Sequence, residues 1–163
     1  MIRQRAFTLV EILVVIIISA ILASITLLSL RDTSSDYFLR DDLARLAALL
    51  QRNCRDALIS GQHIGIRVDN RGYDVFRYEG AEWVDIQAES VIYRHHDWSD
   101  SWRLRLEFQG LETEIDEADD TPQLICLGSG ELLPFRLALG GGLNLPLVLY
   151  GRSDGQVTIE NNR

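Results

Sequence analysis

The chain has 163 residues, with 16 basic and 24 acidic side chains and a formal net charge of −8. This length argues for one domain of ordinary size with an appendage. The acidic balance works against a nucleic-acid partner, because phosphate binding needs clustered cationic side chains. Every basic residue is arginine, which excludes a Walker A phosphate loop, a Schiff base and a Ser-x-x-Lys nucleophile, since each of these needs lysine.

The beginning of the chain is a long apolar segment. Residues 7–30 carry a single charge, Glu11, and the nineteen residues from 12 to 30 carry none. A helix rises about 1.5 Å per residue, so these nineteen residues span about 28 Å, close to the hydrocarbon thickness of a bilayer. The segment is longer than the apolar part of a secretory signal. We therefore predict a transmembrane helix over residues 7–30.

The residues that flank this segment predict its orientation. Arg3 and Arg5 precede it without an acidic neighbour, whereas Arg31 is followed closely by Asp32. Basic flanks stay in the cytoplasm, so the N-terminus is expected there. Residues 31–163 are then expected in the periplasm of a bacterium with two membranes. The chain is thus predicted to be a single-pass protein of the inner membrane.

Beyond the apolar segment the hydrophobic period changes twice. Apolar residues recur at three- and four-residue steps to about residue 60, which predicts an amphipathic helix continuous with the membrane segment. After Gly61 the period becomes two and short strands follow, separated by turn residues. One helix followed by many strands predicts an α+β fold, with a long N-terminal helix packed on antiparallel β-sheets. Strands are expected at residues 64–68, 73–77, 83–86, 102–108, 111–115, 123–127, 135–139, 147–150 and 156–159.

Two patterns suggest metal ligands. His95, His96 and Asp97 are consecutive, but neighbouring strand residues point to opposite faces and no third ligand follows at a suitable spacing. Residues 112–120 contain six acidic side chains, without the spacing or central glycine of an EF-hand. We interpret the first as solvated loop residues. We interpret the second as a solvated acidic loop that could also contact a basic partner, and we predict no metal site.

Other patterns suggest catalysis or a redox role. Ser129 lies between two glycines, but the pattern is not Gly-x-Ser-x-Gly, and the run Gly140–Gly142 lacks the lysine of a phosphate loop. We therefore predict no catalytic residue and no cofactor. Cys54 lies on the apolar helix face and Cys126 in an apolar strand. The oxidising periplasm permits a disulfide between them, and two buried thiols are the favoured interpretation.

The N-terminus resembles the class III signal of type IV pilins and type II secretion pseudopilins. Residues 6–15 read Ala-Phe-Thr-Leu-Val-Glu-Ile-Leu-Val-Val, and the family pattern is a basic leader, a Gly, Phe-Thr-Leu-x-Glu and an apolar run. Ala6 stands where the family has Gly. The resemblance implies that a prepilin peptidase cuts between Ala6 and Phe7 and that Phe7 is N-methylated. In a filament, Glu11 is expected to pair with the Phe7 α-amine of a neighbouring subunit and to set the axial register.

The C-terminal half resembles one subgroup, the GspH minor pseudopilins. Residues 127–139 hold a Ser-Gly-Glu loop, a Pro-Phe pair and a strand, and residues 151–156 form a Gly-containing hairpin pattern. The resemblance implies a structural protein at or near the tip of the periplasmic pseudopilus, needed for export of folded proteins across the outer membrane. Its partners are expected to be other minor pseudopilins, the major pseudopilin, the prepilin peptidase and the inner-membrane assembly platform.

The resemblance also implies three parts of the chain. Residues 1–6 are the cleaved leader, residues 7–30 the transmembrane and polymerisation helix, and residues 31–163 the periplasmic pseudopilin domain. The chain is expected to be a substrate of the peptidase and to catalyse no reaction itself.

An alternative within the same fold family is a FimT-like minor pilin of type IV pili, involved in DNA binding and uptake or in pilus assembly. Such proteins are expected to have an Arg-rich C-terminal end. The final thirteen residues of this chain contain Arg152 and Arg163 against Asp154 and Glu160. This balance favours the secretion branch, so no nucleic acid is expected as partner.

Overall fold

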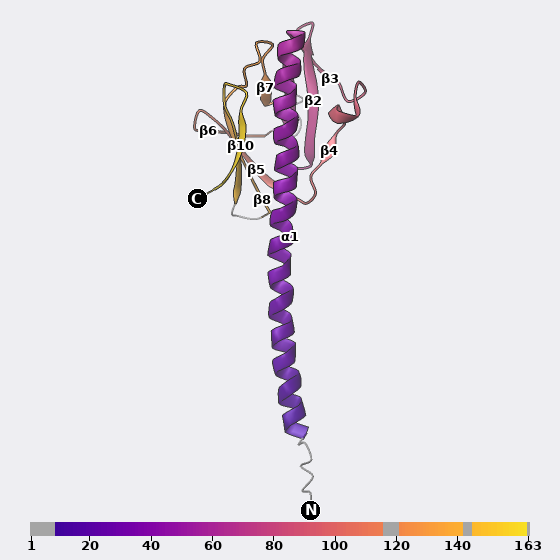
Figure 1. The fold of residues 1–163 in the computed structure, drawn as a ribbon, viewed down its shortest axis with the longest axis vertical. Helices are drawn as coiled ribbons and strands as arrows, with labels where there is room; N and C mark the ends of the chain where they lie inside the picture. Colours follow the sequence, from indigo (N-terminus) through magenta and orange to yellow (C-terminus); the bar gives the residue numbers. More distant parts are fainter. Residues whose placement is uncertain (1–8, 116–120, 142–144, 163) are drawn as a thin grey trace, which may run out of the picture. The chain divides into compact units, whose positions relative to one another are not determined.

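The computed structural model of the chain describes residues 9–115, 121–141 and 145–162, with the side chains of residues 23–35 left out (Figure 1). The chain divides into two compact units, residues 1–37 and 38–163. The helix α1 (Leu9–Ser60) contributes to both units. Its end agrees with the prediction: Gly61 adopts a left-handed φ of 70°, and its N–H donates to the carbonyl of Ala57 at 2.8 Å.

The predicted membrane span lies only partly within the described residues. Residues 7–8 and the side chains of residues 23–35 fall outside them. Over the described part of the chain, no helix combines the length and the hydropathy that a membrane crossing requires. What is described of the predicted span is a helix whose side chains from residue 9 to residue 22 are all exposed.

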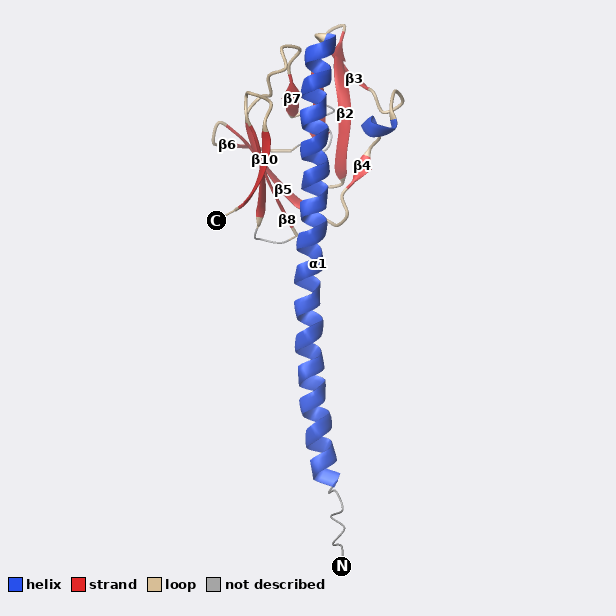
Figure 2. Cartoon of the chain, viewed as in Figure 1, coloured by secondary structure: helices blue, strands red, loops and turns tan. Residues whose placement is uncertain are grey.

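The second unit contains two antiparallel sheets. In Figure 2, β2, β3 and β4 of the first sheet lie on one side of α1, and β7 of the same sheet lies on the other side with β5, β6, β8 and β10 of the second sheet. The first sheet has the order β3-β2-β1-β7, with β4 paired to β2, and the second has the order β10-β9-β8-β5-β6. The α+β class is therefore confirmed. The first sheet is built from β1 (Ile64–Val68), β2 (Gly72–Glu79), β3 (Glu82–Asp85), β4 (His96–Asp97) and β7 (Leu124–Cys126). The second is built from β5 (Arg103–Phe108), β6 (Leu111–Thr113), β8 (Phe135–Gly140), β9 (Leu147–Gly151) and β10 (Val157–Asn161).

The short strand β4 and the 3₁₀ turn η1 (Val91–Tyr93) do not follow from the sequence pattern. A two-residue strand is too short to show an alternation of apolar and polar residues. Gly72 makes the pairing of β4 with β2 possible, because a Cβ atom there would lie 2.0 Å from the carbonyl oxygen of His96. The turn before Gly72 is closed by Asp69, whose carboxylate accepts from the backbone N–H of Arg71 at 2.7 Å.

The hydrophobic core of the second unit lies between α1 and both sheets. The predicted apolar face of α1 is confirmed, since Leu39, Leu43, Leu46 and Leu50 are each at most 1% exposed. The same core cluster takes side chains from strands of both sheets. Burial of one continuous helix face against two sheets is the main stabilising term of this unit. The strand residues at its centre include Ile66, Val75, Leu106, Leu137 and Leu149.

A disulfide joins α1 to the first sheet. Cys54 and Cys126 are bonded, with Cα atoms 4.9 Å apart and a sequence separation of 72. The interpretation of these residues as two buried thiols is therefore wrong. Their apolar surroundings were predicted correctly, but hydrophobic periodicity does not reveal which helix position faces which strand position.

Candidate assembly site

The peptidase and methylation residues, Ala6 and Phe7, lie outside the described residues. Glu11 lies within them, in the first turn of α1, and its side chain is exposed. A carboxylate in this turn is favoured by the partial positive charge of the helix N-terminus. The structure thus places Glu11, the residue predicted to set the register, at the beginning of the apolar helix.

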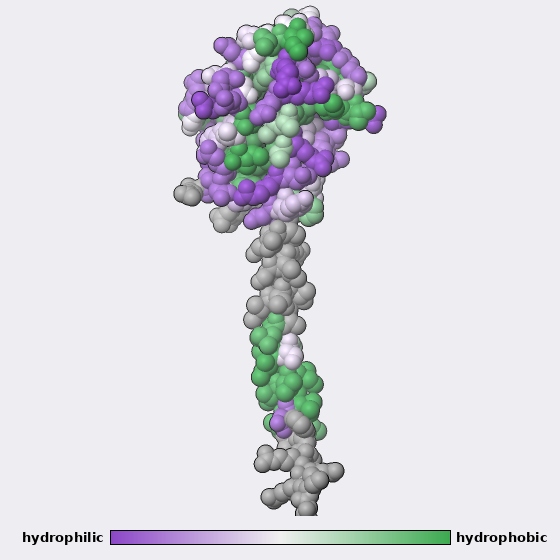
Figure 3. Space-filling model, viewed as in Figure 1, coloured by the Kyte–Doolittle hydropathy of each residue, from purple (hydrophilic) through white to green (hydrophobic). Residues whose placement is uncertain are grey.

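Glu11 is surrounded by an exposed apolar surface. Five side chains at helical spacing form a shallow apolar groove along one face of α1, and the hydrophobic colouring of this segment is visible in Figure 3. Their exposed fractions range from 50% to 81%. Soluble proteins rarely leave such a continuous apolar surface in water, so this face is suited to contact with lipid or with other apolar helices. The groove is lined by Leu9, Ile12, Leu13, Ile16 and Ile17.

In the second unit, a buried carboxylate on α1 holds the connection between the two sheets. Asp42 is 0% exposed and accepts hydrogen bonds from the backbone N–H of Ser99 at 2.9 Å and from its hydroxyl at 2.8 Å. It also accepts from the indole N–H of Trp102 at 2.7 Å. His96 Nε2 lies 3.6 Å from the same carboxylate. Asp42 therefore fixes the segment from β4 in one sheet to β5 in the other against the helix.

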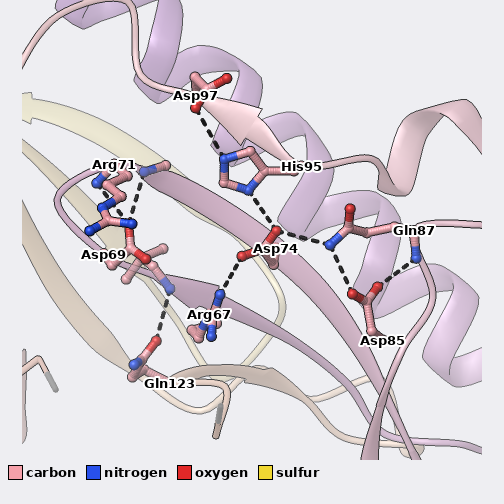
Figure 4. A network of polar contacts seen from close by, with 11 residues as sticks. Arg67, Asp69, Arg71, Asp74, Asp85, Gln87, His95, Asp97 and Gln123 are labelled. Atoms are coloured by element: carbon pink, nitrogen blue, oxygen red, sulfur yellow. Dashed lines mark hydrogen bonds and ion pairs between the residues drawn. The ribbon is translucent and has the colours of Figure 1, made fainter. Parts of the chain in front are cut away.

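A second polar network surrounds Asp74 on β2 (Figure 4). Its carboxylate is almost fully buried and accepts from Arg67 Nη2 at 2.7 Å and from Gln87 Nε2 at 3.2 Å. His95 Nδ1 lies 2.6 Å from Asp74 Oδ1, the oxygen that also accepts from Gln87, and His95 Nε2 lies 3.2 Å from Asp97. The network fastens the segment around η1 to the face of β2.

The position of His95 between two carboxylates favours its cationic form. A neutral imidazole donates from one nitrogen only, whereas both nitrogens of His95 face an acceptor. Burial lowers the pKa of His95, but the hydrogen bonds and charges of Asp74 and Asp97 outweigh it and hold this pKa above its ordinary value of 6.5. The contacts with Asp74 and Asp97 therefore stabilise the cationic form of His95 relative to the neutral form.

The interpretation of the two histidines as solvated loop residues is therefore incomplete. His95 and His96 turn to different carboxylates, Asp74 and Asp42, as expected for neighbours in an extended segment. Groups of three or more potential metal ligands do not occur among the residues that the structure describes. A helical wheel could have indicated Asp42, because it shares the face of Leu39 and Leu46. The burial of Asp74 had no comparable signal in the sequence.

The remaining sequence candidates form ordinary contacts. The hydroxyl of Ser129 lies 3.4 Å from Glu131, in an exposed turn. In the acidic segment, Glu112 pairs with Arg105 across β6 and β5 at 3.2 Å, while residues 116–120 lie outside the described residues. The glycine run begins at the end of β8, and its last glycine is also outside them.

Comparison with known proteins identifies the family of the chain. The family description "Prokaryotic N-terminal methylation motif" matches residues 1–27. The type II secretion system protein H of Pseudomonas aeruginosa is 33% identical over 147 residues, which is 83% of each chain. The chain belongs to the type II secretion system protein H family. The protein H of Escherichia coli K12 is 27% identical over 152 residues, which is 90% of this chain and 87% of that protein.

Solved structures share the fold of this protein H family member. The minor pseudopilin EpsH from the type II secretion system of Vibrio cholerae aligns with a TM-score of 0.62 and 20% identity, over 75% of this chain and 94% of that one. The solution structure of E. coli GspH aligns with a TM-score of 0.61 and 21% identity, over 77% and 89%. These likenesses confirm the α+β pseudopilin fold, and the names of the relatives support the secretion branch rather than the FimT-like alternative.

Proposed function

We propose that this protein H family member is a minor pseudopilin at or near the tip of the periplasmic pseudopilus, where it supports export of folded proteins across the outer membrane. Before assembly it is a single-pass inner-membrane protein with a cytoplasmic N-terminus and a periplasmic second unit. The observation that carries the proposal is the exposed apolar face of α1 with Glu11 in its first turn. That face suits first lipid and then neighbouring helices.

Glu11 is proposed to select the register in which the helices join. A carboxylate at the centre of a membrane helix costs about 2.5–3.5 kcal/mol on insertion scales. Glu11 lies four residues after Phe7, about 6 Å along a helix, so in the free membrane form it stays near the cytoplasmic interface. In the fibre, where water is excluded, the α-amine of a neighbouring Phe7 supplies its cation. An incorrect register would leave both charges unpaired.

The rest of the chain has complementary roles in this proposal. The prepilin peptidase removes residues 1–6 by cutting between Ala6 and Phe7, and Phe7 is then N-methylated. The inner-membrane assembly platform adds the subunit to the fibre, where α1 contacts the major pseudopilin. The second unit selects the neighbouring minor pseudopilins, and it acts through contacts and without catalysis.

The test of the register role replaces Glu11 by Ala and by Gln in cells that depend on this chain for secretion. Both variants are expected to reach the membrane fraction at the level of the unmodified chain but to reduce secretion and cross-linking to other pseudopilins. Asp36→Ala, which removes an exposed carboxylate from the same helix, is the matched control and should secrete normally. Normal secretion and cross-linking by Glu11→Ala would contradict the proposal.

Processing is tested separately by the intact mass of the protein purified from the membrane fraction. The expected chain begins at Phe7 and carries the mass of one added methyl group. A deletion of the peptidase gene should restore the full-length mass and abolish secretion. A chain that begins after residue 30, or one that retains Met1 in secreting cells, would show that the predicted processing is wrong.

A further inference from the structure

A pocket of about 400 Å³ in the second unit lies between α1 and the segment that connects η1 to β4. Its α1 wall is one helix face, with residues at steps of three and four. Its volume is within the range of sites that bind small molecules or a few side chains. The α1 wall contains Arg45, Ala48, Leu49 and Arg52, and the remaining lining contains Tyr73, Val91, Ile92, Arg94, His95 and His96.

Two apolar side chains of this pocket, Val91 and Ile92, lie outside the hydrophobic core. Val91 and Ile92 are 73% and 46% exposed, and η1 contributes no buried residue. The turn is nevertheless held in place, because the hydroxyl of Tyr93 donates to Asp56 on α1 at 2.9 Å. The Ser90 hydroxyl accepts from the N–H of Ile92 at its beginning. The structure thus presents two branched apolar side chains to solvent on a fixed support, which is the arrangement of an anchor site for a partner.

The rim of the pocket carries three arginine side chains, two in ion pairs and one without an ion pair among the described residues. Arg45 pairs with Asp41 at 2.9 Å and Arg52 with Asp56 at 3.3 Å, each one helical turn apart and exposed to water. Arg94 is also exposed and forms no ion pair within the described part of the chain. A guanidinium group binds a carboxylate through two parallel hydrogen bonds. Arg94 therefore offers a position for one carboxylate beside the apolar side chains of η1.

We propose that this pocket binds an acidic segment of a neighbouring pseudopilin subunit. This inference rests on the proposed function. One carboxylate of that segment contacts Arg94, and an adjacent apolar side chain packs against Val91 and Ile92. The charges favour this partner over nucleic acid. Two of the three arginines are already paired, which leaves one guanidinium group for one carboxylate and not the cluster of cationic side chains that a nucleic-acid backbone needs.

The first test measures binding of defined probes to the full chain in detergent micelles. The probe is a fluorescein-labelled peptide, Gly-Asp-Leu-Glu-Ile-Glu-Gly, and its control replaces each acid by the matching amide. The acidic peptide should bind at least tenfold more tightly than the amide peptide. Arg94→Glu should weaken the acidic peptide at least tenfold, and Ile92→Ser about fivefold. Arg103→Glu, an exposed arginine on β5 outside the pocket, should change it less than twofold.

The outcomes of this first test separate the alternatives. Equal affinity for the acidic and amide peptides, no binding of either, or equal effects of Arg94→Glu and Arg103→Glu would overturn the proposal. A single-stranded DNA oligonucleotide that binds more tightly than the peptide would also overturn it. Unchanged tryptophan fluorescence in each variant shows that the second unit remains folded.

The second test places a photoreactive amino acid at position 92 or at position 103 in secreting cells. Position 92 should cross-link to an acidic segment of another pseudopilin, identified by mass spectrometry of the joined peptides, and position 103 should not. A joined peptide without acidic residues would overturn the inference. If Glu11→Ala impairs secretion while position 92 forms no subunit cross-link, the proposed function stands and the inference about the pocket fails.

Discussion

The replacement of Asp42 by Ala should strongly destabilise the second unit. Trp102 is 2% exposed, so its indole N–H would lose its acceptor without gaining water, at a cost of about 1–3 kcal/mol. Ser99 is exposed, so water can replace the carboxylate at its two donors, and we assign about 1 kcal/mol to that exchange. The expected loss is therefore about 2–4 kcal/mol of the free energy of unfolding.

Urea unfolding of the full chain in detergent, followed by tryptophan fluorescence, measures this loss. With a slope near 2 kcal/mol per molar urea, the midpoint should fall by about 1–2 M. Asp42→Asn should be milder, because its amide oxygen can still accept from Trp102. Asp41→Ala is the matched control, because it removes the same charge from a solvent-exposed pair with Arg45 that contributes little to stability.

Two results would refute this reasoning. One is a free energy of unfolding for Asp42→Ala within about 0.5 kcal/mol of that for Asp41→Ala, since burial of the carboxylate would then not matter. The other is an equal loss of the free energy of unfolding in Asp42→Ala and Asp42→Asn. The effect would then come from the removed charge and not from an indole N–H without an acceptor.

Three further predictions concern the same unit. Cys54→Ala with Cys126→Ala removes the closure of a 72-residue loop, worth about 4 kcal/mol in the chain-entropy model, and should lower the urea midpoint relative to the oxidised chain but not relative to the reduced one. The pKa of His95 is raised above 6.5, so its ion pair with Asp74 stabilises the fold fully below pH 6.5, and this stabilisation is lost as the pH rises through the raised pKa. The urea midpoint should therefore fall as the pH rises from 6.5 through that pKa, and His95→Gln should remove this fall. Asn53 is fully buried, and neither of its amide atoms has a hydrogen-bond partner among the described residues, so Asn53→Leu should keep or raise the free energy of unfolding. A loss above about 1 kcal/mol in the same urea titration would contradict this prediction.

Hydrophobic periodicity predicted the parts of this fold that repeat. The leucines from Leu39 to Leu50 follow the helical period, and the strand pattern after Gly61 follows the period of two, so the α+β class and the apolar helix face were both predictable. Strand pairing and the disulfide were not predictable, because no local sequence pattern indicates β4 or the disulfide partner of Cys54. Such features depend on contacts between residues far apart in the chain.

Among the polar sites, too, some features could be predicted from the sequence and others could not. Asp41 and Asp42 are chemically identical neighbours, but Asp42 lies on the buried face of α1 and accepts from Trp102, whereas Asp41 pairs with Arg45 near the surface. The N-terminal assembly signal was readable because its residues lie next to one another in the sequence. The pocket beside η1 was not readable, since its walls come from α1, β2 and the segment before β4.

The bond between Cys54 and Cys126 has a mechanical consequence for a subunit that is pushed or pulled through its helix. A force along α1 reaches β7 directly through the sulfur atoms, as well as through the backbone beyond Gly61. The chain between the two cysteines, residues 55–125, cannot be extended while the bond is intact, which keeps roughly 240 Å of contour length folded. Under tension along α1, the oxidised subunit is therefore expected to extend less than the reduced one.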